Sequence, residues 1–237
     1  METILEFKEV DYTYAGAARE TLTKVNAAFE KSKLYVIYGP SGSGKTTALA
    51  LAGALDVPTS GQVLYGGTDI RADGLRTHRK NHVAFIFQNY NLLGYMTALE
   101  NITAAMDITA AGGDTAAERK TLARALLTEL GLQEDEISRN VLKLSGGQQQ
   151  RVAIARALAS NADIILADEP TGNLDPDTAK GIVDILQKLA HERGKCVIAV
   201  SHSAELAKAA DEVLTIKSGA LVPVFVVRSE DETVMTV

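Results

Sequence analysis

The sequence predicts an α/β fold with a mostly parallel sheet, an antiparallel β portion at the N-terminus and an inserted α-helical subdomain. Short apolar runs typical of strands buried on both faces alternate with stretches of helical spacing. This alternation indicates a parallel sheet covered by helices. From about residue 91 to residue 159 the pattern becomes mostly helical, and no flexible linker sets that stretch apart. We therefore expect a helical insertion within one domain.

The early part of the chain is expected to be mainly β-structure. Four β-rich runs are predicted as strands: Ile4–Val10, Val25–Phe29, Leu34–Tyr38 and Val83–Phe87. The first two are joined by the turn-like Tyr14–Gly16, and Lys45–Leu55 carries good helix formers after the third.

The insertion is expected to contain a helix over Glu118–Leu130, with Leu122, Ala125, Leu126 and Leu130 on its buried face. Another helix is expected from near Gly147 to Ala159. The C-terminal part should alternate again, with strands at Ile164–Ala167, Val197–Val200 and Val213–Ile216 and helices at Lys180–Glu192 and Ser203–Ala210. The segment from Val222 to Val237 is expected to add a terminal strand, with a contact to a partner as the alternative.

Composition limits the function classes. The chain has 237 residues, 30 acidic against 24 basic side chains and a net charge of −6, which gives no support for nucleic acid as a partner. The single cysteine, Cys196, excludes an intrachain disulfide and a cysteine-based zinc cluster. No apolar run approaches the roughly 18 residues that a membrane helix needs. We therefore expect a soluble chain, with any membrane crossing done by another polypeptide.

A phosphate-binding loop is predicted between the third strand and the first helix. Its residues fit the pattern G-x-x-x-x-G-K-[ST]: Gly39, Pro40, Ser41, Gly42, Ser43, Gly44, Lys45 and Thr46, with Thr47 following. Glycines let backbone N–H groups turn toward an anion, Lys45 should reach the β- and γ-phosphates, and the Thr46 hydroxyl should bind Mg²⁺. The alternative is a glycine-rich turn without a ligand. The pattern predicts a P-loop NTPase core, but does not separate a kinase, a GTPase or a motor.

Two carboxylates, Asp168 and Glu169, follow the apolar run Ile164–Ala167. Since ligands of open parallel sheets bind at the carboxyl ends of the strands, this pair is expected to meet the phosphate loop. Asp168 is the candidate Mg²⁺ partner, and Glu169 is the candidate for orienting a water against the γ-phosphate. The alternative is a pair of solvated carboxylates at a strand end.

A second glycine motif lies at the start of a predicted helix and consists of Ser145, Gly146, Gly147 and Gln148. Ser145 is expected to cap the helix, and the glycines leave its N–H groups uncovered, which makes a second anion-binding helix start. An ordinary helix cap without a ligand is the alternative.

Together these motifs resemble those of the nucleotide-binding subunits of ATP-binding cassette (ABC) transporters. Leu144–Gln148 matches the family signature, Gly39–Thr46 its Walker A motif and Ile164–Asp168 its Walker B motif, and the resemblance runs from about Ile4 to Leu221. It implies one ABC ATPase domain over 1–237: a core of about 1–90 and 160–221, a helical subdomain of about 91–159 and an extension of about 222–237. It also implies that a second copy or a related subunit packs head to tail, so that each ATP lies between one phosphate loop and the opposite signature.

The resemblance assigns roles to further residues. Gln88 matches the glutamine that touches Mg²⁺ or water, and His202 matches the switch histidine at the γ-phosphate. Tyr14 matches the aromatic residue that stacks on adenine, with Tyr12 as a nearby competitor. Asn173–Asp175 matches the loop that crosses the dimer interface. One departure is Ser32-Lys33, where the family usually has Gly-Glu.

Within this family, the sequence resembles the branch of macrolide exporters and lipoprotein-release ATPases at three segments: Glu169–Asp175, Phe87–Leu93 and Thr97–Asn101. This branch also includes bacitracin-type peptide-resistance transporters and a cell-division ATPase. This implies an ATPase on the inner face of the cell membrane that drives a permease subunit by mechanotransmission, with drug, peptide or lipid-linked cargo. Phe87–Asn101 would then receive the permease's coupling helix. The alternative is a regulatory ATPase that activates a cell-envelope enzyme through a membrane partner without transport. A soluble repair or translation protein is disfavoured, because paired cassettes and long coiled-coil insertions are both missing.

Overall fold

The computed structural model describes residues 2–228 and 233–236 of the chain. Its larger sheet has seven strands in the order β11-β10-β9-β3-β8-β7-β6. The five strands at its centre and one edge are parallel to one another. They are β9 (Glu212–Lys217), β3 (Leu34–Tyr38), β8 (Cys196–Ser201), β7 (Ile164–Asp168) and β6 (Val83–Ile86). This confirms the predicted α/β fold with a mostly parallel sheet.

Both faces of the parallel strands are buried, because alternate side chains enter different hydrophobic clusters. In β8, Cys196, Ile198 and Val200 pack toward α1 (Lys45–Ala52) and the N-terminal strands. Val197 and Ala199 pack toward the helices on the other face, among them α7 (Pro176–His191) and α8 (Ala204–Ala209). The all-apolar runs in the sequence reflect this two-sided burial.

The N-terminal β portion forms a separate antiparallel sheet in the order β2-β1-β4-β5. Its strands are β1 (Thr3–Tyr12), β2 (Leu22–Glu30), β4 (Ser60–Tyr65) and β5 (Thr68–Asp69). β4, β5 and the short helix α2 (Leu75–Asn81) were not predicted, because the strands are short and largely polar and α2 lacks an acidic first turn.

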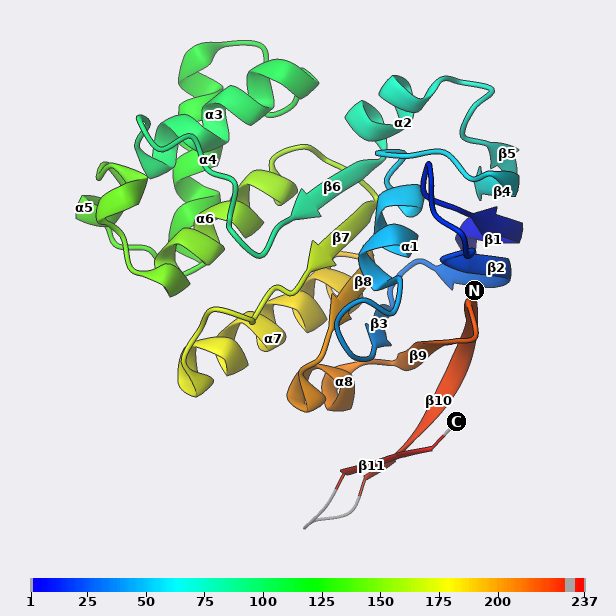
Figure 1. The fold of residues 1–237 in the computed structure, drawn as a ribbon. Helices are drawn as coiled ribbons and strands as arrows, with labels where there is room; N and C mark the ends of the chain where they lie inside the picture. Colours follow the sequence, from blue (N-terminus) through cyan, green and yellow to red (C-terminus); the bar gives the residue numbers. More distant parts are fainter. Residues whose placement is uncertain (1, 229–232, 237) are drawn as a thin grey trace.

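The helical subdomain lies beside β6 and β7 in Figure 1. Its elements are α3 (Ala98–Thr109), α4 (Ala116–Glu129), α5 (Glu134–Ile137), the 3₁₀ turn η1 (Val141–Lys143) and α6 (Gly146–Leu158). Threonine or serine capping boxes begin α3, α4 and α6, so polar side chains satisfy these helix starts. α6 packs against β6 and α7, which fixes the subdomain to the core.

One predicted helix face is wrong in part: Leu126 and Leu130 are buried as predicted, but Leu122 and Ala125 are not. Leu122 is 43% exposed and Ala125 is also exposed, whereas Ala123 and Leu127 are fully buried beside Leu126. Apolar residues surround much of α4, so the spacing alone did not decide which stripe meets the core.

The chain ends in two further antiparallel strands, β10 (Ala220–Arg228) and β11 (Thr233–Thr236). They extend the large sheet beyond β9, as predicted for an added terminal strand (Figure 1); residues 229–232 and 237 of the predicted segment lie outside the described residues. Where the resembling family usually has Gly-Glu, this chain has Ser32-Lys33. Ser32 has a φ of 62°, and the Lys33 ammonium pairs with Glu30 and Glu212 at 2.6 Å each. These carboxylates raise the pKa of Lys33.

Among residues 2–228 and 233–236, we find no helix with the length and apolar character of a membrane span.

Candidate active site

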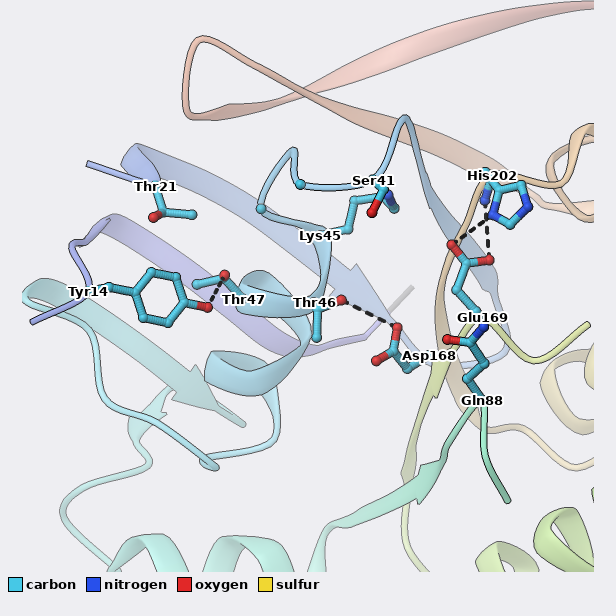
Figure 2. Close-up of a pocket in the computed structure, with 12 residues that line it drawn as sticks. Tyr14, Thr21, Ser41, Lys45, Thr46, Thr47, Gln88, Asp168, Glu169 and His202 are labelled. Carbon is cyan, nitrogen blue, oxygen red and sulfur yellow. Dashed lines mark hydrogen bonds and ion pairs between the residues drawn. The ribbon is translucent and has the colours of Figure 1, made fainter. Parts of the chain in front are cut away.

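A cavity of about 490 Å³ opens where the parallel strands end (Figure 2). Most of the segments that reach it lie at the ends of four neighbouring strands of the sheet, β3, β8, β7 and β6, and one more is the connection between β1 and β2. It is lined by Tyr14, Thr21, Ser41, Gly42, Gly44, Lys45, Thr46, Thr47, Gln88, Asp168, Glu169 and His202. The strand order therefore gathers predicted site residues that lie far apart in sequence.

The phosphate loop brings together a buried cation and a buried hydroxyl. The ammonium of Lys45 is buried and donates to the carbonyl oxygens of Gly39 (2.8 Å) and Pro40 (2.7 Å). The Ser43 hydroxyl is buried without a hydrogen-bond partner among the described residues. Gly44 has a φ of +99°, and a Cβ there would lie 3.2 Å from Thr21 Cγ2. A buried cation, an unpartnered hydroxyl and the start of α1 together fit a polyphosphate.

Oxygen ligands suited to Mg²⁺ lie beside this loop. Thr46 Oγ1 donates to Asp168 Oδ1 at 3.4 Å, and Gln88 lines the same cavity. Burial raises the pKa of Asp168, the neighbouring Glu169 charge adds to that, and the Thr46 hydrogen bond and the Lys45 charge oppose it. Hydroxyl, carboxylate and amide oxygens are the hard ligands that Mg²⁺ accepts, so this set fits the ion.

Glu169 is held in an unusual conformation directly after β7. Its φ of 45° is left-handed, which costs a non-glycine residue about 1–2 kcal/mol. The backbone N–H of Glu169 donates to Val200 O at 2.9 Å, and His202 Nδ1 lies 3.0 Å from Glu169 Oε1 (Figure 2). Backbone and side chain thus aim the carboxylate along the end of β8, into the cavity.

The two candidate aromatic residues occupy different environments. The Tyr14 side chain is 51% exposed and its hydroxyl lies 2.7 Å from Thr47 Oγ1 (Figure 2). The Tyr12 ring is buried and meets Tyr14 edge to face, with centroids 4.9 Å apart. A hydrogen bond to Asp56 raises the pKa of Tyr12 to about 12. Only the Tyr14 ring has an open face for a base.

The signature residues lie elsewhere in the chain. Ser145, Gly147 and Gln148 line a second cavity of about 300 Å³, which the phosphate loop does not reach. Ser145 caps α6 by accepting the Gln148 N–H, as predicted. A Cβ on Gly146 would lie 2.9 Å from Tyr90 Oη, so the first glycine is needed for packing as well. One chain therefore does not bring its two glycine motifs together.

Two residues at the site, one beside the phosphate loop and one beside Glu169, were missed by the sequence analysis. Thr21 precedes β2 and reaches the phosphate loop only through the fold. Ser201 ends β8 and donates to Glu169 Oε2 at 3.0 Å. Its place directly before His202 was the available signal.

The sequence matches the family model described as ABC transporter over residues 22–172. The ABC transporter ATP-binding protein YclH of Bacillus subtilis is 45% identical over 92% of this chain and 95% of its own length. The macrolide export ATP-binding/permease protein MacB 2 of Aeromonas hydrophila is 42% identical over 92% of this chain. This chain spans 34% of that longer relative.

Solved structures of ATP-binding cassettes are similar to this chain as well. The cassette MJ0796 of Methanocaldococcus jannaschii, solved as a dimer, is 38% identical and has a TM-score of 0.83 over 92% of this chain and 96% of that one. A second structure of MJ0796, in a post-hydrolysis state with ADP and Pi, has the same identity, TM-score and coverage. The chain described here therefore belongs to the ABC transporter family, as one of its ATP-hydrolysing cassettes.

Proposed function

We propose that the chain is a single ABC ATPase domain over 1–237, two copies of which close head to tail around two ATP molecules. The observation that carries this proposal is the separation of the two glycine motifs within one chain. A second chain, identical or related, supplies the missing signature. MJ0796, whose solved structure is described as dimeric, supports this arrangement.

Each predicted site residue has a role in this proposal. The loop residues Gly39, Pro40, Ser41, Gly42, Ser43, Gly44, Lys45, Thr46 and Thr47 surround the phosphates of ATP. Tyr14 stacks on adenine. Thr46, Gln88 and Asp168 hold Mg²⁺, which when bound neutralises charge on the β- and γ-phosphates. The signature residues Ser145, Gly146, Gly147 and Gln148 of the opposite chain close the site.

Hydrolysis follows from the position of Glu169. Its carboxylate orients a water and takes a proton from it while the water oxygen forms a bond to the γ-phosphorus. The bond from that phosphorus to the bridging oxygen breaks, so ADP leaves with the electron pair. Phosphoryl transfer depends mainly on positioning and charge stabilisation, which Lys45 and His202 provide at the γ-phosphate.

The membrane partner is proposed to be a permease, and the chain to act on the inner face of the cell membrane. The macrolide export relative joins an ATP-binding part and a permease part in one protein, and this chain corresponds to about a third of it. A groove of about 250 Å³ between core and helical subdomain is lined by Arg79, Phe85, Phe87, Asn91 and Arg156, among others. It includes part of the predicted Phe87–Asn101 surface, and we assign it to the coupling helix. Drug, peptide or lipid-linked export by mechanotransmission is the proposed outcome.

A pull-down from native membranes tests this function. Tagged Glu169→Gln with ATP is expected to hold the closed state and to retain a permease with a large external domain. A permease accompanied by a cell-wall hydrolase would instead establish the regulatory alternative. Recovery of ribosomal or repair factors without any membrane protein would contradict both.

A further inference from the structure

The Glu169 carboxylate receives three hydrogen bonds from Ser201, which ends β8, and from His202, which follows it. Ser201 Oγ donates to Oε2 at 3.0 Å, and the His202 backbone N–H donates to the same oxygen at 3.4 Å. The His202 ring donates from Nδ1 to Oε1 at 3.0 Å. The two carboxylate oxygens are therefore held by different groups.

These groups differ in how firmly they are fixed. The His202 side chain is 67% exposed, so its ring can turn toward a nucleotide without disturbing the core. Ser201 is 1% exposed and lies in register with Tyr38 in the middle of the parallel sheet. Its carbonyl accepts the Gly39 N–H at 3.3 Å, which ties it to the start of the phosphate loop.

The direction of the Ser201 hydroxyl follows from counting donors. A serine hydroxyl carries a single hydrogen. The Ser201 oxygen accepts the backbone N–H of Ser203 at 3.0 Å, so the hydrogen remains for Glu169 Oε2. Because an ionised carboxylate only accepts, this assignment gives a partner to the Ser201 hydroxyl, to the Ser203 N–H and to Oε2 of Glu169.

We propose that Ser201 is a positioning residue for ATP hydrolysis. It fixes Oε2 of Glu169, so that Oε1 faces the attacking water once the His202 ring has turned to the γ-phosphate. The inference rests on the proposed function of Glu169. Ser201 is buried and joins the phosphate loop, through its carbonyl oxygen, to the Glu169 carboxylate, through its hydroxyl.

The test compares Ser201→Ala with Ser201→Thr, which keeps the hydroxyl. Ser201→Ala is expected to lower kcat about tenfold or more, because a hydrogen bond to a charged group is lost. Its KM for ATP should stay within about twofold, since the phosphate loop is intact. Ser201→Thr should restore kcat to within about threefold of the parent value.

Ser203→Ala is the matched control. It removes a neighbouring hydroxyl that caps α8 through the Leu206 N–H at 3.3 Å but does not touch Glu169. We expect a lower melting temperature and an unchanged kcat. Equal loss of kcat in Ser201→Ala and Ser203→Ala, an unchanged kcat in Ser201→Ala, or a loss in Ser201→Ala that Ser201→Thr does not restore would overturn the inference. A loss matched by weaker ATP binding would do the same.

Glu169→Gln separates this inference from the proposed function. If Glu169→Gln keeps multiple turnover, the role of Glu169 itself is wrong. If Glu169→Gln stops turnover while Ser201→Ala is fully active, only the role of Ser201 is wrong. In the Glu169→Gln background, Ser201→Ala should leave the remaining turnover unchanged, because the two residues act through one carboxylate.

Discussion

Replacing Tyr14 by alanine is predicted to weaken ATP binding while leaving tripolyphosphate binding unchanged. The Tyr14 ring is half exposed at the edge of the cavity, and it packs edge to face with the Tyr12 ring, with the two centroids 4.9 Å apart. Stacking between a base and an aromatic side chain contributes about 1–3 kcal/mol. The dissociation constant for ATP should therefore rise about 5- to 150-fold.

Isothermal titration in the Glu169→Gln background measures this affinity without hydrolysis. Tyr14→Phe is the matched control, because it keeps the ring and removes only the hydroxyl that lies 2.7 Å from Thr47 Oγ1. It should bind ATP within about threefold of the parent. Tyr12→Phe should mainly lower stability, since Tyr12 is buried against Asp56.

Two results would refute this reasoning. If Tyr14→Ala left ATP affinity unchanged, the ring would not be the adenine platform. If Tyr14→Ala weakened tripolyphosphate as much as ATP, Tyr14 would act by shaping the phosphate loop through Thr47.

Three further predictions concern catalysis, packing and pH. Glu169→Gln should lower kcat about 10²- to 10⁴-fold and keep ATP affinity, and similar kcat values for this variant and the parent would contradict that role. Lys45→Ala should weaken ATP binding in a nucleotide titration, and an unchanged affinity would contradict the role of Lys45. Gly53→Ala should lower the free energy of unfolding by about 1–3 kcal/mol in urea melts, because its Cβ would lie 2.0 Å from Phe85 Cζ; an unchanged midpoint would show that this contact relaxes freely. Burial lowers the pKa of His78 from 6.5, so the unfolded chain takes up the proton more readily than the folded chain, and stability should fall as the pH drops below about 6.5. In thermal melts, His78→Gln should reduce this dependence of stability on pH. An equal dependence in His78→Gln would show that other groups cause it.

The parts predictable from sequence were those that local chemistry determines. The apolar run Ile164–Ala167 became β7 because both of its faces are buried, and Ser145 became a helix cap because its hydroxyl accepts the Gln148 N–H. The order of the strands was not predicted. That order is what brings Gln88 and His202 into one cavity.

The missed features depend on contacts between distant segments. Thr21 reaches the phosphate loop only because the antiparallel sheet packs over α1, and no motif marks it. β4 and β5 were not predicted, since both strands are short and partly exposed.

The most direct test of the central claim is the mass of Glu169→Gln in solution with and without Mg²⁺-ATP, measured by light scattering. We expect a monomer of 25.2 kDa without nucleotide and twice that mass with it. Ser145→Arg in the same background should prevent the increase, because it blocks the signature that the opposite ATP needs. A chain that binds ATP through Lys45 yet remains a monomer at high concentration would contradict the claim that two chains complete each site.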